Sequence, residues 1–276
     1  MKLKFIGQTT AQRRELILTA SPIKTLIILS LPALMMAMLQ AMMPFTDGLF
    51  INRLTDHVTA SAVSFSQPII FIVLALGQGL SVGATAIIGQ LNGRGDIDES
   101  RKRATQIFVF AFLLGLVSIP LLFIIGTVIS YTLKSEIAPL VFRYISLYCL
   151  VMPFSFMEAI YNGIKNANGK PEAPFFRMII MLIIKIIGNF IFLYIFRMKI
   201  DGCVLASLLA NIVVAAWMFY DLFIKNTPDK LTLKQFKFLP SVIRELIHVG
   251  FPAMINYAFI YVGFFLINRE MEPMGL

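Results

Sequence analysis

A series of long apolar runs with almost no charged residues constrains this chain more than any other feature. Between Arg103 and Lys134 there are 30 consecutive residues without a charge, and a helix needs about 20 apolar residues to cross the hydrocarbon core of a bilayer. The sequence therefore predicts an all-α integral membrane protein. Comparable runs predict seven spans, at residues 25–51, 60–91, 104–132, 138–164, 175–197, 202–224 and 246–268.

The composition also indicates a membrane protein, and it bears on whether lipid or nucleic acid is the partner. Hydrophobic residues make up 58% of the chain and charged residues 14%, whereas soluble domains average about 45–50% and about 25%. A formal charge of +9 is also compatible with nucleic-acid binding. In a membrane protein, Lys and Arg in loops facing anionic lipid explain that charge more simply. We expect the lipid bilayer as a partner, and no nucleic acid.

The distribution of Lys and Arg predicts how the chain lies in the membrane. With the N-terminus inside, the cytoplasmic connections hold 17 of these residues and the external ones hold 6. Such a bias follows the positive-inside rule. The expected location is the plasma (inner) membrane, with multiple passes and a cytoplasmic N-terminus.

The seventh apolar run resembles the first, which suggests an internal repeat. Pro32-Ala33 matches Pro252-Ala253, and Ile51-Asn52-Arg53 matches Ile267-Asn268-Arg269. Parallel repeats of this kind are a transporter architecture. The alternative is a seven-helix protein with a chance similarity. The repeat predicts four parts: a cytoplasmic arm (1–24), a six-helix lobe (25–224), a cytoplasmic connecting segment (225–245), and the start of a truncated second lobe (246–276). We therefore expect a missing C-terminal lobe of the same protein as a partner.

The first apolar run contains one carboxylate, Asp47, which makes it the leading candidate functional residue. A carboxylate inside a membrane span costs on the order of several kcal/mol unless it is paired or protonated. Helical spacing places it on one face with Met36, Gln40, Met43 and Phe50. Methionine and aromatic faces adapt to varied apolar cations, so these four residues are candidate substrate contacts. Packing against neighbouring helices or lipid is the alternative for each of them.

Several motifs together resemble the multidrug and toxic compound extrusion (MATE) family of cation-coupled exporters. They are Pro32, Gln40 and Asp47 in "LPALMMAMLQAMMPFTD", "GQGLSVGATAIIGQLNGRGD" (77–96), "IYNGIKNANGKPEAP" (160–174), "GNFIFLYIF" (188–196) and "DGCVLAS" (201–207). The resemblance implies twelve helices in two lobes around a cavity that opens alternately to each face. It also implies antiport of amphipathic organic cations or drugs against H⁺ or Na⁺, with no cofactor besides the coupling ion.

The resemblance further implies ion-coupling partners for Asp47 on the fifth and sixth spans, where this sequence has Lys185, Asn189 and Ser207. Asn189 and Ser207 fit as oxygen donors to a cation or as hydrogen-bond partners of Asp47. Lys185 departs from the family's amide, and its ammonium would occupy the place of a sodium ion. The alternative for Lys185 is snorkelling to an interface. We hypothesise that Asp47 switches between Lys185, a proton and a cationic substrate.

Other polar and small residues carry weaker expectations. Glu158, Asn162 and Lys165 are expected to form a surface group rather than a proton relay. Two small-residue motifs, Gly79-x-x-x-Gly83 and Gly89-x-x-x-Gly93, predict close packing of the second span on a neighbour.

Three rival functions differ in class. The main alternative is a lipid-linked precursor flippase of the same superfamily, which needs several cations for an anionic headgroup; beyond Lys185 the spans offer few. A seven-helix receptor would carry its chromophore lysine on the last helix rather than the fifth. We expect no enzyme, because no Ser/His, paired-Asp or His-cluster arrangement falls within the spans.

Overall fold

The computed structural model describes residues 21–133, 135–227, 230–234 and 236–271, so most of the predicted arm (1–24) lies outside the described residues. All regular elements in the described residues are helical, and seven helical segments among them are long and apolar enough to span a membrane. The helices are α2 (Pro22–Leu54), α3 (His57–Arg94), α4 (Ile97–Thr132), α5 (Ala138–Tyr148), α6 (Met152–Ala167), α7 (Glu172–Asn189), α8 (Lys199–Phe219) and α9 (Pro240–Met271). Three shorter elements, η1 (Cys149–Val151), η2 (Phe190–Ile195) and η3 (Tyr220–Ile224), are single-turn 3₁₀ or π segments.

Local sequence signals explain where the helices begin and end. Asp56 caps α3, because its side chain accepts a hydrogen bond from the Thr59 amide at 2.8 Å. Gly95 ends α3 with a φ of 83°, which glycine adopts without the steric penalty of a side chain. The predicted fourth span is interrupted at η1, just before Pro153, whose missing N–H cannot continue the helical ladder.

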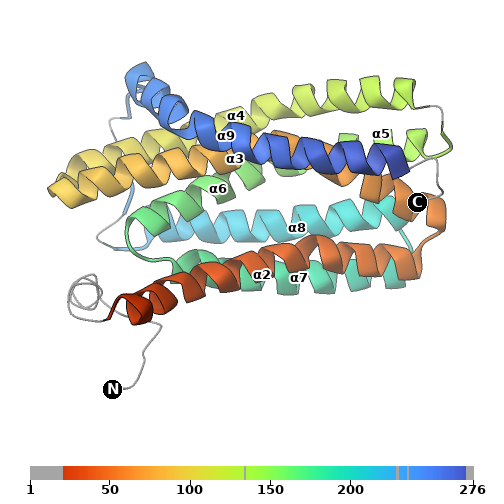
Figure 1. Cartoon of the computed structure of the whole chain (residues 1–276), viewed down its shortest axis with the longest axis horizontal. Coiled ribbons are helices and arrows are strands. Elements are labelled where there is room, and N and C mark those ends of the chain that lie inside the picture. Colours follow the sequence, from red (N-terminus) through yellow and green to blue (C-terminus); the bar gives the residue numbers. More distant parts are fainter. Residues whose placement is uncertain (1–20, 134, 228–229, 235, 272–276) are drawn as a thin grey trace.

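The helices fall into two groups that pack more tightly within themselves than against each other. In the first group, α3 packs on α6 and α9, and α4 packs on α5 and α6. In the second group, here called the three-helix group, α7 packs on α8 and α2. Figure 1 shows α2, α7 and α8 together on the side away from α4 and α9. Contacts between α6 and α7 are few by comparison.

Small residues set the close crossing of α3 and α9. A methyl group built at Gly79 would lie 2.2 Å from Met254 Cγ, and one at Gly250 would lie 2.7 Å from the Gly79 carbonyl oxygen. Only glycine permits this approach. The prediction for Gly79 and Gly83 is therefore confirmed. The prediction for Gly89 and Gly93 is wrong, because no described neighbour lies within 4 Å of a methyl group at either position.

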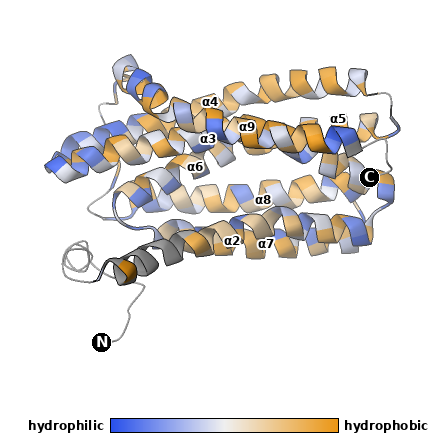
Figure 2. Ribbon diagram, in the orientation of Figure 1, coloured by the Kyte–Doolittle hydropathy of each residue, from blue (hydrophilic) through white to orange (hydrophobic). Residues whose placement is uncertain are grey.

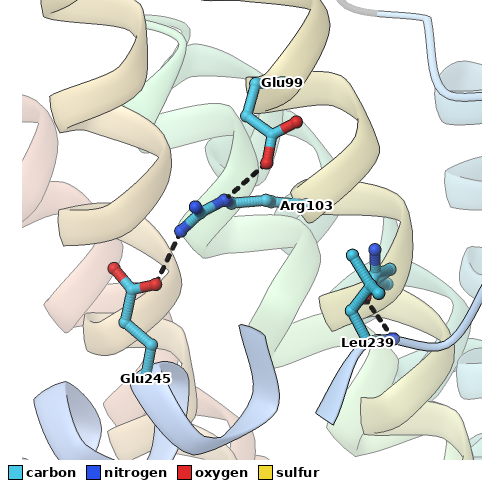
Figure 3. Close-up of polar contacts among 5 residues, drawn as sticks. Glu99, Arg103, Leu239 and Glu245 are labelled. Atoms are coloured by element: carbon cyan, nitrogen blue, oxygen red, sulfur yellow. Dashed lines mark hydrogen bonds and ion pairs between the residues drawn. The ribbon is translucent and has the colours of Figure 1, made fainter. Parts of the chain in front are cut away.

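The α9 helix begins at Pro240, six residues earlier than the seventh apolar run predicted. Its first turns are held against α4: Arg103 forms ion pairs with Glu99 at 2.9 Å and with Glu245 at 2.6 Å (Figure 3). The backbone amide of Leu239 donates to the Gln106 side chain at 3.0 Å. Because Arg244 and Glu245 fall within the first two turns of this helix, the hydropathy of the sequence could not locate its first residue.

Hydrophobic and hydrophilic residues are separated along the length of the helices. Figure 2 shows hydrophobic residues along most of each helix and hydrophilic residues gathered at the shared end of α3 and α4. Beyond the narrow face of α9 that contacts α3, large apolar side chains of this helix are exposed, among them Phe251, Phe259 and Phe264. An apolar exterior is what a bilayer requires, because lipid replaces water as the solvent.

Candidate ion-pair site in the membrane

A buried ion pair joins α2 to α7 at the position where the sequence analysis placed its leading candidates. The Lys185 ammonium lies 2.6 Å from Asp47 Oδ2, and Asn189 Nδ2 donates to Asp47 Oδ1 at 3.0 Å. The spacing of four residues puts Lys185 and Asn189 on the same face of α7. Both oxygens of the carboxylate therefore have a partner, one charged and one neutral.

Burial makes this pair energetically important. The Lys185 side chain is 7% exposed and the Asp47 side chain 5%, so neither charge is hydrated and each compensates the other. Lys185 thus turns inward to a carboxylate and does not snorkel to an interface. Asn189 is fully buried, and its Oδ1 has no hydrogen-bond partner among the described residues. That acceptor lies on the amide that holds Asp47.

Ser207, the remaining candidate for ion coupling, is buried on α8 but bonds elsewhere. Its hydroxyl donates to the Cys203 carbonyl at 3.1 Å, and its own carbonyl accepts from Asn211 at 2.9 Å. Hydroxyl groups in helices commonly make this bond to the preceding turn. The structure therefore brings together Asp47, Lys185 and Asn189, while the Ser207 hydroxyl stays with its own helix.

The candidate substrate contacts on α2 differ in their surroundings. Met43 and Phe50 are half-buried and pack against the hydrophobic core. Met36 is also half-buried, whereas Gln40 is exposed. The face that the sequence predicted is therefore turned into the bundle near Asp47 and is open at Gln40.

A second set of buried charges was not predicted, and we call it the α6–α7 charge cluster. Its members are Glu158, Tyr161, Lys165, Arg177 and Asp221. Glu158 pairs with Arg177 at 2.6 Å; Asp221 pairs with Lys165 at 2.6 Å and accepts a hydrogen bond from Tyr161 at 2.9 Å. The Arg177 side chain is fully buried, and the Lys165 side chain is 3% exposed.

This cluster corrects the expectation of a surface group on α6. Glu158 and Lys165 do lie on one helix face, as their spacing indicated, but α7 and η3 cover that face with opposite charges. The partners stand near helix ends, where a sequence reading assigns charges to loops. The only indication of these partners in the sequence was the number of charged residues at the borders of the apolar runs.

Ion pairs also cross between the helix groups at the opposite end of the bundle. Arg143 donates to both carboxylate oxygens of Asp201, at 2.8 and 2.6 Å. Lys199, the first residue of α8, lies 2.7 Å from Asp56, which stands in the turn before α3. The hydrogen bond from the Lys199 ammonium, with a further one from Thr59, holds the pKa of Asp56 well below its usual range.

No group of three or more His, Cys, Asp or Glu side chains in the described residues is arranged to hold a metal ion. The chemistry of the site around Asp47 is therefore described by a carboxylate, an ammonium and an amide. Both oxygens of that carboxylate are held by these two nitrogen donors.

Comparisons of the sequence with family models and with curated proteins point to the same family. The family model described as MatE matches residues 32–191. The multidrug export protein MepA of Staphylococcus aureus (strain bovine RF122 / ET3-1) is 26% identical over 239 residues, which are 85% of this chain and 53% of that protein. MepA of Staphylococcus saprophyticus is 22% identical over 260 residues, 93% of this chain and 57% of that protein.

Solved structures share the fold. One is an outward-facing multidrug resistance MATE family transporter of the MOP superfamily, with a TM-score of 0.80 at 22% identity over 91% of this chain and 56% of that one. Another is a MOP superfamily transporter from Pyrococcus furiosus, described as having a binding pocket of reverse polarity, with a TM-score of 0.79 at 22% identity over 91% and 56%. The chain spans about half the length of the curated relatives it matches.

Proposed function

Because the chain belongs to the MatE family of transporters, we propose that it forms one lobe of a secondary antiporter that exports amphipathic organic cations in exchange for protons or sodium ions. The observation that carries this proposal is the buried Asp47–Lys185 pair supported by Asn189. Relatives named as multidrug export proteins support the substrate class.

Family membership excludes two rival classes considered from the sequence. MatE proteins are transporters, as the names of the relatives and of the solved structures state, and they are not enzymes. A seven-helix receptor is excluded for the same reason. The predicted division into an arm (1–24), a lobe (25–224), a connection (225–245) and the start of a second lobe (246–276) remains part of the proposal.

In the proposed mechanism, Asp47 is a shared acceptor for cations. In the conformation described here, the Lys185 ammonium occupies one of its oxygens. An organic cation that reaches Asp47 must displace that ammonium, so substrate binding and the α2–α7 contact are coupled. Pro44, three residues earlier in α2, removes one backbone hydrogen bond and provides a place where the helix can bend.

Proton coupling fits this geometry better than sodium coupling. The ammonium of Lys185 lies 2.6 Å from Asp47 Oδ2, so a sodium ion would have to displace it to bind that oxygen. A proton transferred to Asp47 cancels the charge that holds Lys185, and it leaves a buried ammonium without its partner. That imbalance drives α2 and α7 apart, which links protonation to the opening of the lobe.

The remainder of the proposal concerns the whole transporter. We propose that a second lobe packs on the exposed apolar face of α9 and that the two lobes alternate access to a shared cavity. The preferred location is the inner membrane with a cytoplasmic N-terminus, supported by the excess of Lys and Arg in alternate connections.

An anionic substrate, such as a lipid-linked precursor, is the second candidate. From the sequence, Lys185 was the main cation expected within the spans, but the structure also buries Lys165 and Arg177. Each of these three cations contacts a carboxylate, which reduces the positive potential an anion would meet, so the cation exporter remains the preferred function.

Transport by the intact protein in proteoliposomes tests the proposal. An imposed proton gradient is expected to drive ethidium export. Asp47→Asn should abolish it, and Lys185→Ala should uncouple it from the gradient. Asp201→Asn is the matched control, because this carboxylate pairs with an arginine outside the candidate site. If both site variants export ethidium at the wild-type rate, the proposed site is wrong; if fluorescent phosphatidylglycerol moves and ethidium does not, the second candidate replaces the first.

A further inference from the structure

The Arg177 guanidinium is the most conspicuous group that the proposed transport site does not use. Its side chain is fully buried, and its Nη1 contacts Glu158 Oε1 at 2.6 Å and the Met181 sulfur at 3.7 Å. Its Nε and Nη2 have no hydrogen-bond partner in the described part of the chain. Each unsatisfied buried donor costs about 1–3 kcal/mol, so these two nitrogens are expected to have a partner in the working protein.

The positions of the two unpaired nitrogens on the guanidinium indicate the kind of group that can bind to them. Nε and Nη2 share one edge of the planar guanidinium, and their N–H bonds run parallel. This edge matches two oxygens of a carboxylate or a phosphate, which arginine binds in a bidentate manner. Glu158 occupies the other end of the group through Nη1, so a second oxyanion can bind without displacing the first.

The surroundings of Arg177 favour an amphiphilic ligand that enters from the side of the bundle. Arg177 is the sixth residue of α7, about 7.5 Å along the axis from Glu172, the first residue of that helix. By the distribution of Lys and Arg, this end faces the cytoplasm, at the depth of lipid headgroups. On the same helix, Phe176 and Ile180 are 43% and 41% exposed, which offers an apolar track for an acyl chain.

The contact between α6 and α7 is the place where a ligand could reach the buried edge. These two helices have few contacts with each other, whereas α7 packs mainly on α8 and α2. The Glu158 side chain, next to Arg177, is 17% exposed. We expect a small separation of α7 from α6 to uncover the guanidinium edge. The Asp47–Lys185 pair joins α2 to α7 within the three-helix group, so it should not be disturbed.

We propose that the Nε–Nη2 edge of Arg177 is a binding site for the oxyanion group of an amphiphile, either a carboxylate or a phosphate, reached through the α6–α7 contact. The neighbouring Glu158 sets the affinity, because its charge offsets that of Arg177. The site needs neither ion-coupled transport nor a second lobe, so it stands or fails separately from the proposed function.

Tryptophan fluorescence gives a direct binding assay on this chain in detergent. Trp217 is the only tryptophan in the sequence, and its ring lies 6.1 Å from that of Tyr161, a member of the α6–α7 charge cluster. The probes are decanoate and decyl phosphate, with 1-decanol as the uncharged control of equal chain length. We expect both anions to bind about 10- to 100-fold more tightly than decanol, as charged bidentate hydrogen bonds allow.

Two substitutions separate the guanidinium edge from charge alone. Arg177→Lys keeps the positive charge beside Glu158 but removes the bidentate edge, and it should bring decanoate affinity down to that of decanol. Glu158→Gln removes the competing charge and should tighten decanoate binding at least several-fold. Arg143→Lys, which changes an exposed arginine at the other end of the bundle, should leave binding unchanged. Glu158→Gln keeps the proposal falsifiable if Arg177→Lys does not fold.

The source of the oxyanion is resolved by repeating the titration in lipid nanodiscs. Loss of decanoate binding in phosphatidylglycerol identifies a lipid headgroup as the occupant, and retained binding identifies a free amphiphile; either result supports the site. The proposal is overturned if decanoate binds no better than decanol, or if neither Arg177→Lys nor Glu158→Gln changes its affinity. In that case the edge holds buried water only.

Discussion

Removing one partner of the Asp47–Lys185 pair should destabilise the protein far more than removing both. The two side chains are 5% and 7% exposed, and their charged atoms are 2.6 Å apart. A single substitution leaves an uncompensated charge in a low-dielectric interior, which costs about 3–5 kcal/mol. Replacing both by neutral residues of similar size, Asp47→Asn with Lys185→Met, should return the free energy of unfolding to within about 1 kcal/mol of wild type, because such pairs are often neutral when replaced together.

The geometry gives the reason why the double variant should be tolerated. Asn189 donates to Asp47 Oδ1, and an asparagine at position 47 offers an equivalent carbonyl oxygen. Methionine fills the path of the Lys185 side chain without a charge. The two single penalties of about 3 kcal/mol or more and a double penalty within about 1 kcal/mol give a coupling free energy of about 5 kcal/mol or more between the two side chains.

The assay is reversible unfolding in mixed micelles, measured for wild type, both single variants and the double variant. Single penalties below about 1 kcal/mol, or additive penalties in the double variant, would refute the reasoning.

Two further predictions concern parts of the molecule outside the site. Gly79→Ala should weaken the packing of α9 on α3 and lower the unfolding temperature, because its methyl group would lie 2.2 Å from a Met254 atom. Gly89→Ala on the same helix is the control, because open space surrounds that position, and it should leave the unfolding temperature unchanged. Equal effects of the two substitutions would contradict the close crossing. Asp56→Asn retains the helix cap but loses the ion pair with Lys199, so it should cost less than about 1 kcal/mol at pH 7 for this exposed pair. Because the pKa of Asp56 is lowered in the folded state, this contribution to stability is present above the unfolded pKa of about 3.9 and is lost as the pH falls below it. If the difference in free energy of unfolding between wild type and Asp56→Asn instead grows on going to about pH 3, the predicted sign is wrong.

Much of the fold could be predicted because the membrane imposes a simple rule on sequence. Every backbone polar group in a bilayer must be satisfied internally, so each long apolar run had to be a helix, and seven such helical segments are found in the described residues. The beginning of α9 at Pro240 was missed because two charged residues, Arg244 and Glu245, interrupt its first turns, and because the contacts with Arg103 and Gln106 that hold this end are tertiary.

The candidate site was only partly accessible from sequence. Asp47 and Lys185 stood out because each is a lone charge within an apolar run, and opposite charges in such runs are expected to meet. The cluster around Arg177 and Asp221 did not stand out, since charges near helix ends are usually solvated. Which helix covers which face depends on tertiary packing, and one-dimensional spacing on α6 does not contain that information.

Binding of a fluorescent organic cation such as ethidium at equilibrium tests the central claim most directly, because the claim is that Lys185 and the substrate compete for Asp47. The account predicts that Lys185→Met binds ethidium more tightly than wild type and that Asp47→Asn binds it more weakly. If Lys185→Met binds no more tightly, or if Asp47→Asn binds as well as wild type, then the ammonium is not a competitor and the carboxylate does not receive the substrate.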